Sequence, residues 1–246
     1  MEEVKETGIL KKVIFQDLGA MDYAEAWDLQ KKLLDQIQEI KAFNQNLPVC
    51  EQTVNYNFLL FVEHPHVYTL GKSGKQQNLL VDENFLRQKG AQFFKIDRGG
   101  DITYHGPGQI VGYPIFDLEA FSLGVKQYVH LMEEAIIQTL HEYGIESGRL
   151  DGATGVWLDV NLPGRTRKVC AIGVKVSRSV TMHGFAFNVN TDLNYYHFIN
   201  PCGFVDKGVT SMEKELGKKL DFEEVKKVLS TKMQQLFKFE FADLPD

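Results

Sequence analysis

Amphipathic stretches and short apolar runs alternate along this chain without a regular period, and this pattern constrains the fold most. Apolar residues recur at three- and four-residue steps over 22–43, 125–143 and 221–237, which predicts three helices. Shorter apolar runs, typical of strands, occupy 13–18, 58–62, 67–70, 93–96, 156–158, 169–176 and 180–189. Because these runs follow no steady βαβ repeat and many lie close enough for hairpins, we expect an α/β (α+β) fold with a mixed, largely antiparallel sheet and packed helices.

Smaller signals mark the ends of several elements. Asp22 and Glu25 form a capping-box pattern at the start of the first helix. A turn is predicted at His64–Pro65, between two buried strands, and a short helix over 82–89 is closed by Gly90.

The length of the chain bounds its domain organisation. A chain of 246 residues suits one large domain or two small ones, and 43% hydrophobic residues with 24% charged residues are ordinary for a globular protein. We expect a single domain over 1–246 with the last helix packed on it. The stretch 203–220 is the best candidate for an internal boundary.

Charge and apolar content exclude several classes of protein. Lys and Arg number 27 and Asp and Glu 33, and the resulting net charge of −6 argues against nucleic acid as a partner. The longest apolar runs, such as 58–62, are far too short to span a bilayer, so no membrane partner is expected. Residues 1–12 are charged and lack the apolar core of a secretory signal. We therefore expect a soluble, cytoplasmic protein.

The cysteines and histidines give little sign of a metal centre. Cys50, Cys170 and Cys202 form no C-x-x-C pair, so neither a disulfide framework nor a structural zinc site is expected, and a reduced compartment fits. No pair of histidines has the H-x-x-x-H spacing of a zinc protease, and no G-x-S-x-G motif is present. The sequence therefore predicts no metal.

A glycine-rich stretch over 98–109 is the first candidate for a binding wall. Its glycines allow close approach of a ligand, and Arg98, Thr103, Tyr104, His105 and Gln109 place polar groups among them. The spacing matches neither G-x-x-x-x-G-K-[ST] nor G-x-G-x-x-G, so no nucleotide phosphate site follows. A plain turn-rich hairpin is the alternative interpretation.

Cys202 and Lys168 are the second candidate. Cys202 lies between Pro201 and Gly203, which shape the backbone tightly, although a buried inert thiol is the alternative. A thiol with an ordinary pKa of about 8.5 needs a nearby cation or base to react at neutral pH. Lys168 opens an apolar strand and could supply that charge, or its ammonium could reach solvent. Lys175, seven positions further on, is expected on the opposite face.

Four separated blocks of the chain match the motifs of one known family. They are EHPHVYTLG at 63–71, the glycine-rich stretch at 98–109, KVCAIG at 168–173, and HGFAFNVN at 183–190 leading to Pro201–Cys202–Gly203. With Val209–Thr210–Ser211 and Glu213, the likeness spans residues 55–217. In this pattern the chain resembles the lipoyl(octanoyl) transferases, the octanoyl-acyl carrier protein: protein N-octanoyltransferases of lipoate biosynthesis. The resemblance implies a fold similar to the catalytic domains of biotin and lipoate ligases.

The resemblance also implies a reaction and the residues that perform it. In such enzymes the cysteine of the P-C-G motif takes the octanoyl group as a thioester beside the lysine of the K-x-x-x-I-G motif. These positions map to Cys202 and Lys168. The implied substrate-binding residues are Arg98, Gly99, Gly100, Asp101, Ile102, Thr103, Tyr104, His105, Ala171, Ile172, Gly173, Gly184, Phe185 and Ala186. Among these, Tyr104, Ile172 and Phe185, together with Phe187, are expected to wall the octanoyl tail, and His183 is a candidate auxiliary group.

Partners follow from the same resemblance. The donor would be octanoyl-acyl carrier protein, the acceptors would be lipoyl domains of 2-oxoacid dehydrogenase E2 subunits and the glycine cleavage H protein, and no cofactor is implied. An ATP-dependent lipoate or biotin-type ligase and a non-catalytic acyl- or lipoyl-domain-binding module are the alternatives. Because such partners tend to be acidic, we expect a basic docking patch, with Lys72, Lys75, Arg165, Arg167 and Arg178 as candidates.

Overall fold

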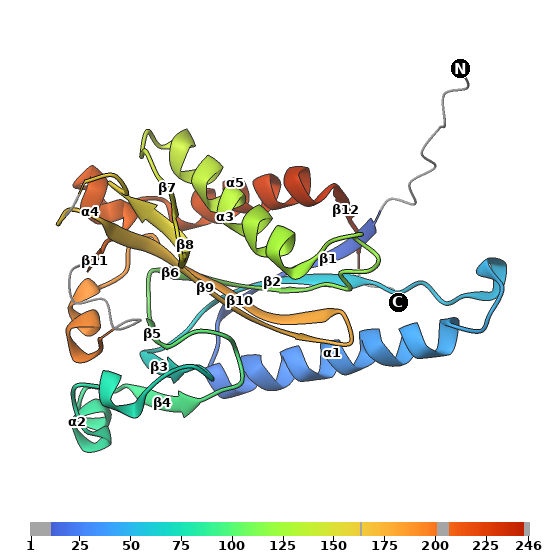
Figure 1. The fold of residues 1–246 in the computed structure, drawn as a ribbon, viewed down its shortest axis with the longest axis horizontal. Coiled ribbons are helices and arrows are strands. Elements are labelled where there is room, and N and C mark those ends of the chain that lie inside the picture. Colours follow the sequence, from blue (N-terminus) through green and yellow to red (C-terminus); the bar gives the residue numbers. More distant parts are fainter. Residues whose placement is uncertain (1–10, 163, 201–206, 244–246) are drawn as a thin grey trace.

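One mixed sheet runs through the molecule and carries helices on both faces (Figure 1). The computed structural model describes residues 11–162, 164–200 and 207–243. Within these ranges the main sheet has nine strands, in the order β12-β1-β2-β6-β10-β9-β8-β7, with β11 paired to β9. The strands are β1 (Lys11–Ala20), β2 (Asn57–Glu63), β6 (Gln109–Ile115), β7 (Gly148–Leu150), β8 (Ala153–Leu158), β9 (Arg167–Ser177), β10 (Val180–Asn188), β11 (Gly208–Val209) and β12 (Phe239–Phe241).

The centre of this sheet is antiparallel. β2 pairs with β6, β6 with β10, β10 with β9, and β9 with β8. β1 is parallel to both of its neighbours, β2 and β12, and β11 is parallel to β9. The parallel pair β1–β2 is joined through α1 (Tyr23–Asn44), because a parallel connection needs a long crossover. The predicted mixed, largely antiparallel sheet with packed helices is confirmed.

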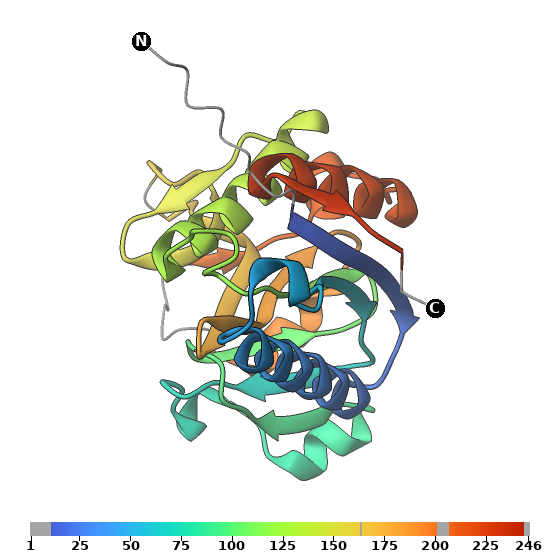
Figure 2. The ribbon, with the colours of Figure 1, turned by 90° about the vertical axis from the view of Figure 1, so that its right-hand side faces the viewer.

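Three helices cover the sheet, and their positions confirm the three predicted amphipathic segments. α1 lies on one face, and α3 (Val125–Glu142) and α5 (Phe222–Phe237) lie on the other (Figures 1 and 2). α1 buries Leu33 and Ile37 against Leu60 of β2. On the opposite face Met132 of α3 and Leu229 of α5 share one apolar cluster with the sheet. The helices therefore form the outer layers of a helix–sheet–helix sandwich.

The capping-box prediction for α1 is wrong. Asp22 is extended, as an N-cap residue should be, but its side chain makes no capping hydrogen bond. The preceding residue instead fixes the entry to the helix, since the Met21 N–H donates to the Glu63 carbonyl over 3.1 Å and the Met21 carbonyl lies 2.8 Å from Nδ1 of His64. These contacts with β2 and His64 fix the direction in which the chain enters α1.

A smaller sheet stands beside the start of α1 and carries the glycine-rich stretch (Figure 2). Its order is β4-β3-β5. The turn at His64–Pro65 leads from β2 into this second sheet, and β5 lies inside the glycine-rich stretch. The remaining elements are β3 (Val67–Leu70), β4 (Gln92–Lys95), β5 (Ile102–His105), α2 (Glu83–Gln88), α4 (Met212–Leu216), and the short 3₁₀ turns Val49–Glu51, Gln76–Asn78 and Leu193–Phe198.

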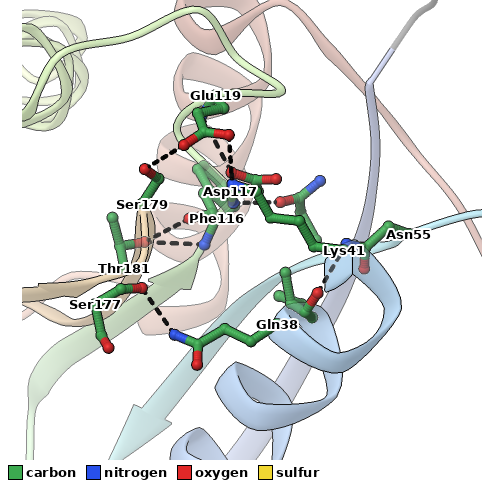
Figure 3. A network of polar contacts seen from close by, with 11 residues as sticks. Gln38, Lys41, Asn55, Phe116, Asp117, Glu119, Ser177, Ser179 and Thr181 are labelled. Carbon is green, nitrogen blue, oxygen red and sulfur yellow. Dashed lines mark hydrogen bonds and ion pairs between the residues drawn. The ribbon is translucent and has the colours of Figure 1, made fainter. Parts of the chain in front are cut away.

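Polar contacts fix the second half of α1 to the end of β6 and to the β9–β10 turn (Figure 3). Nζ of Lys41 lies 2.8 Å from a carboxylate oxygen of Asp117 and 2.7 Å from one of Glu119. Nε2 of Gln38 donates to the carbonyl of Ser177 over 2.8 Å. These contacts hold the helix across the face of β6 and β10.

The C-terminal part of the chain is tied to its beginning. β12 follows α5 and pairs with β1, with Phe239 opposite Lys11. Part of the candidate boundary at 203–220 lies outside the described residues, and the single-domain expectation stays a prediction. Among the residues that the structure describes, no helix has the length and apolar content needed to cross a membrane.

Candidate active site

A cavity of about 550 Å³ lies beside β9 and β10, where the glycine-rich stretch meets the turn between β7 and β8. It brings together most of the candidate residues, although they come from three distant blocks of sequence. Those that line it are Arg98, Gly99, Gly100, Asp101, Ile102, Thr103, His105, Lys168, Ala171, Ile172, Gly173, His183, Gly184, Phe185 and Ala186.

Two of the predicted wall residues are not among those that line the cavity. Tyr104 is buried in the smaller sheet against Tyr68 and Tyr196, and its hydroxyl bonds to Nδ1 of His66 over 2.7 Å. Phe187 lies in the apolar cluster under α3 and α5. Side chains alternate between the faces of a strand, so Tyr104 points away from the face on which Thr103 and His105 reach the cavity.

Small side chains open the space on the α1 face of the main sheet. Ala171 pairs with Ala186 and Gly173 with Gly184 across β9 and β10, and directly paired residues share a face. Val111 of β6 pairs with Ala186 and extends the same face. Ala171 and Ala186, which have no side chain beyond Cβ, leave a groove beside Val111, whereas backbone oxygens of Gly99 and Gly112 lie against Gly173 and Gly184.

Gly173 allows the glycine-rich stretch to lie against β9. The Gly99 N–H donates to the Val174 carbonyl over 2.9 Å. A Cβ on Gly173 would lie 2.6 Å from the Gly99 carbonyl oxygen, closer than real side-chain contacts allow. The packing of the glycine-rich stretch against β9 therefore depends on the absence of a side chain at Gly173.

A hydrogen-bonded chain fixes Arg98 and His105 in this wall. Nη2 of Arg98 donates to the carbonyl and the hydroxyl oxygen of Thr69, over 2.8 and 3.1 Å. The Thr69 hydroxyl lies 3.3 Å from Nε2 of His105, and Nδ1 of His105 donates to Oε1 of Gln109 over 3.0 Å. Burial holds the pKa of His105 well below its usual value, so its ring is neutral at neutral pH.

His183 adopts a backbone conformation that is rare for a residue with a side chain. Its φ is +59°, and its N–H donates to Oε1 of Gln30 over 2.9 Å instead of to a strand. Pro114, which has no N–H to offer, lies next to this part of β10, since a Cβ on Gly184 would be 2.8 Å from Pro114 Cδ. The left-handed turn brings the His183 ring to the cavity wall.

Asp97 orients the ring of His183. Nε2 of His183 lies 3.0 Å from one carboxylate oxygen of Asp97, and Nζ of Lys175 lies 2.6 Å from the other. Burial alone would raise the pKa of Asp97, but hydrogen bonds from His183 and Lys175 outweigh it and hold this pKa at about 2. Burial lowers the pKa of His183 to about 4. His183 is therefore neutral at neutral pH and donates its Nε2 proton to the Asp97 carboxylate.

Two tyrosines close the cavity at the α1 end, and a third histidine holds one of them. Tyr23, at the start of α1, and Tyr113, on β6, both line it. Nδ1 of His64 donates to the Met21 carbonyl over 2.8 Å, so its Nε2 accepts the Tyr113 hydroxyl proton over 2.8 Å. Burial lowers the pKa of His64 to about 4, which keeps this pair uncharged.

Lys168 lines the cavity from the start of β9. Its Nζ lies 4.4 Å from the ring centroid of Trp157, within cation–π range. A Cβ on Gly155, which has a φ of +121°, would lie 3.5 Å from Lys168 Cε, so β8 approaches closely here. Lys175 is not among the lining residues, but the register of β9 against β8 shifts between Lys168 and Cys170, so alternation along the strand does not assign the two lysines to opposite faces.

Cys202, the predicted nucleophile, lies outside the described residues. The described chain resumes at Lys207, and β11 then pairs Gly208 with Arg167 and Val209 with Lys168. Cys170, in contrast, is fully buried, and burial raises the pKa of its thiol despite the charge of Lys168. Cys170 is thus a packing residue, as its apolar sequence context indicates.

Several residues of the site carry no clear signal in the sequence. Asp97 precedes the glycine-rich stretch as an ordinary charged residue, and Tyr23 and Tyr113 have the spacing of helix and strand core positions. Two candidates for the basic patch have acidic partners: Arg167 pairs with Glu215 and Asp159, and Arg165 lies 3.6 Å from Asp159. Such pairings join distant segments and leave no local pattern.

Comparison with known proteins supports one family. The model of the family described as lipoyl protein ligase A/B catalytic domain matches residues 22–234. The chain belongs to this family. An octanoyltransferase of Flavobacterium johnsoniae is 56% identical over 233 residues, which cover 94% of this chain and 99% of the relative. An octanoyltransferase of Parabacteroides distasonis is 53% identical over 223 residues, 91% of this chain and 97% of the relative.

Solved structures extend the likeness at the level of the fold. A bipartite lipoate protein ligase from Thermoplasma acidophilum superposes with a TM-score of 0.65 at 14% identity and covers 96% of this chain and 86% of its own. A biotin protein ligase from Aquifex aeolicus, in complex with biotin and ATP, gives a TM-score of 0.50 at 14% identity, covering 93% and 71%. The implied likeness to lipoate and biotin ligase folds is thereby confirmed.

Proposed function

We propose that this chain is an acyltransferase of protein lipoylation that moves an octanoyl group from a carrier-protein thioester to a lysine of a lipoyl domain. One observation carries the proposal. In a chain 56% identical to a named octanoyltransferase, the glycine-rich stretch, residues 171–173 and residues 184–186 line one cavity together with Lys168.

The first half of the reaction forms an acyl-enzyme. The thiolate of Cys202 attacks the carbonyl carbon of the donor thioester, a new sulfur–carbon bond forms, and the carrier thiolate leaves and takes up a proton. The ammonium of Lys168 stabilises the Cys202 thiolate by charge proximity. One thioester replaces another, so the two sides differ little in free energy and no ATP is consumed.

The second half releases the product. The ε-amine of the acceptor lysine attacks the acyl-enzyme, a carbon–nitrogen bond forms, and the bond to sulfur breaks. The amine proton passes to the departing sulfur by way of Lys168. An amide is more stable than a thioester, which drives this step forward.

The cavity walls suit an uncharged acyl chain. Arg98–His105, Ala171–Gly173 and Gly184–Ala186 enclose it, with Tyr104 as a support behind this wall. His183 and His105 are neutral at neutral pH, and His183 serves as an auxiliary wall residue oriented by Asp97. Burial of each methylene contributes about 0.8 kcal/mol of binding free energy.

Donor and acceptor follow from the reaction. We assign octanoyl-acyl carrier protein as donor, and lipoyl domains of 2-oxoacid dehydrogenase E2 subunits and of the glycine cleavage H protein as acceptors. A cytoplasmic location fits a thiol that must stay reduced. The solvent-exposed candidates for docking acidic partners include Lys72 and Lys75, which flank Ser73 on the cavity rim.

Mass spectrometry tests the nucleophile directly. Enzyme mixed with octanoyl-acyl carrier protein should gain one octanoyl group on Cys202, and Cys202→Ser should lose both the thioester adduct and turnover. Cys50→Ser, at an exposed cysteine away from the cavity, is the matched control and should keep both. A Cys202→Ser protein with normal turnover would refute the assignment.

The role of Lys168 has its own readout. In Lys168→Ala the pH at which the Cys202 thiol becomes reactive toward an alkylating reagent should rise toward that of an ordinary cysteine. Lys227→Ala, which removes an exposed lysine of α5 that does not line the cavity, should leave this profile in place. An unchanged profile in Lys168→Ala would remove its activating role.

Omission of ATP separates transfer from ligation. An enzyme of the ligase type would need ATP and free acid, whereas the proposed enzyme should octanoylate a lipoyl domain from the carrier thioester with ATP absent. Carrier binding without any covalent adduct would instead indicate a non-catalytic binding module.

A further inference from the structure

The cavity has two arms, because it reaches both faces of the sheet at the edge of β9. Within the described chain β8 pairs with residues 167–170 of β9. Residues 171–174, which follow on β9, all line the cavity. Of these, Ile172 and Val174 pack with the α3 side of the sheet, as does Phe185 of β10. Ala171 and Gly173 point to the α1 side.

The α1-side arm is the part lined by Ala171, Gly173, Gly184, Ala186, Val111, Tyr113, Tyr23 and His105. The α3-side arm is the part lined by Ile172, Val174, Phe185, Val129 and Ala153. The two arms offer an acyl chain different surroundings, and only one of them needs to hold it.

The α1-side arm ends in a wall of large rings. Tyr113 is 3% exposed and Tyr23 is 2% exposed. The ring of Tyr23 stacks on that of His105, with centroids 5.9 Å apart and planes 15° from parallel. The Tyr113 hydroxyl is held at 2.8 Å by His64, which is itself held by the Met21 carbonyl. Tyr113 is therefore fixed in place by a buried partner that leaves its ring little freedom to swing aside.

Tyr113 stands directly beside the floor of small residues. It lies two residues beyond Val111 on β6, and side chains two apart on a strand share a face. Val111 pairs with Ala186, and Gly184 is two residues before Ala186 on β10. The floor formed by Ala171, Ala186 and Val111 therefore ends at Tyr113, and in the next row the Gly99 carbonyl oxygen lies against Gly173.

The length of the arm matches a medium acyl chain. Gly173 lies five residues after Lys168 on β9, about 17 Å along an extended strand. The seven carbon–carbon bonds of an octanoyl group span roughly 8 Å when extended. The side chain of Lys168 takes up part of the remaining length. A chain of twelve carbons would extend roughly 5 Å further and meet the Tyr113 ring.

From this geometry we infer that the α1-side arm holds the acyl chain and that Tyr113 is the specificity-determining residue that sets the upper limit of its length. The inference rests on the proposed acyl transfer. His64 acts through Tyr113 as a positioning residue, and Ala171 and Ala186 keep the arm wide enough for a chain to pass.

The test compares adducts formed with carrier thioesters of six, eight, ten and twelve carbons, each measured by mass spectrometry on the full chain. In Tyr113→Ala, the ratio of the adduct-formation rate with the twelve-carbon donor to that with the eight-carbon donor should rise at least about tenfold. Burial of each additional methylene strengthens binding about fourfold, and the shorter side chain makes room for the added methylenes. Ala171→Leu should move the preference in the other direction, toward six carbons. Tyr113→Leu is the milder variant, to be used if Tyr113→Ala fails to fold.

Two matched controls separate this effect from general damage. Tyr128→Ala removes an equally buried tyrosine of α3 that is not among the lining residues, and the ratio between twelve and eight carbons should not change. Ala153→Leu fills the α3-side arm with the same substitution as Ala171→Leu and should also leave this ratio unchanged.

Distinct outcomes would overturn the two proposals. If Tyr113→Ala and Tyr113→Leu form the octanoyl adduct but keep the wild-type ratio, Tyr113 does not set the length. A shift caused by Ala153→Leu but not by Ala171→Leu would put the chain in the other arm and refute the inference. Failure of the wild-type chain to form an adduct of any length on Cys202 would contradict the acyl transfer itself.

Discussion

At the scale of single residues, the site depends on positions where a side chain is missing. Gly173 lets the glycine-rich stretch lie against β9, and Gly184 lets β6 and β10 approach each other, since a Cβ there would be 2.1 Å from the Gly112 carbonyl oxygen. Neither position needs a left-handed backbone, so the requirement is one of space. A sequence pattern can show that glycines cluster, but only neighbouring segments show which of them are required.

Gly173→Ala should displace the Gly99 loop and weaken acyl binding. The added Cβ would meet a backbone oxygen, which cannot move aside as a flexible side chain can, and we expect a loss of about 1–3 kcal/mol in the free energy of unfolding. Urea denaturation and the rate of octanoyl adduct formation measure the two effects. Gly148→Ala, where the nearest atom is 4.0 Å away, is the control and should change neither. Equal stability and rate in both variants would contradict the close approach.

Neutral buried histidines also act at this scale, and they predict a dependence of stability on pH. The pKa of His64 is about 4 in the folded protein and near 6.5 when unfolded, so between these values the unfolded chain binds a proton that the folded chain does not. Stability should therefore fall as pH falls from 6.5 to 4, by on the order of 3 kcal/mol for His64. Chemical denaturation at pH 6.5, 5.5 and 4.5 measures this slope. His64→Gln should show a shallower slope, and an identical slope would argue against a neutral buried ring.

At the scale of elements, α1 is held on the sheet by polar contacts at one end and by aromatic packing at the other. Lys41 and Gln38 tie the second half to β6 and the β9–β10 turn (Figure 3), and Tyr23 packs its first turn against His64 and His105. The helix thus closes the α1-side arm of the cavity. Its amphipathic period predicts the helix, but the period does not say that the first turn reaches the site.

Lys41→Met should loosen this attachment. It leaves the Asp117 carboxylate, whose side chain is only 10% exposed, without its ion pair, and we expect a loss of about 1–2 kcal/mol in the free energy of unfolding. The comparison is Arg87→Met, which breaks an exposed pair to Glu83 at 3.9 Å and should cost less than about 0.5 kcal/mol. Denaturation midpoints of the two variants give the answer, and equal midpoints would count against a structural role for Lys41.

At the scale of the whole molecule, strands from the two ends of the described chain lie side by side at one edge of the main sheet. β12 pairs with β1, and Phe239 is 3% exposed within the apolar cluster that includes α3 and α5. β1 would otherwise be an edge strand with unpaired backbone groups. The last helix is therefore joined to the sheet by a strand that is too short to be recognised in the sequence.

Removal of residues 239–246 should destabilise the entire protein. The deletion takes Phe239 out of the core and leaves one side of β1 unpaired, and loss of a buried phenylalanine alone costs about 3–5 kcal/mol. Thermal and urea denaturation should show one cooperative transition at a lower midpoint. Phe241→Ala, at a residue of the same strand that is 40% exposed, should have a much smaller effect. A truncated chain with the wild-type midpoint would mean that β12 does not contribute to the main sheet.

The sequence by itself determined the helices, most of the strands and the blocks that line the cavity. Helical periodicity over 22–43, 125–143 and 221–237 and apolar runs such as 169–176 are local signals, and local signals survive in a single sequence. The tertiary structure decided the pairing of β12 with β1, the separation of β3 from the main sheet, and the exclusion of Tyr104 from the cavity. It also decided that Asp97, Tyr23 and Tyr113 join the site. These outcomes depend on the pairing register of the strands and on which face of the sheet each side chain occupies. Both arise from contacts between segments far apart in the chain.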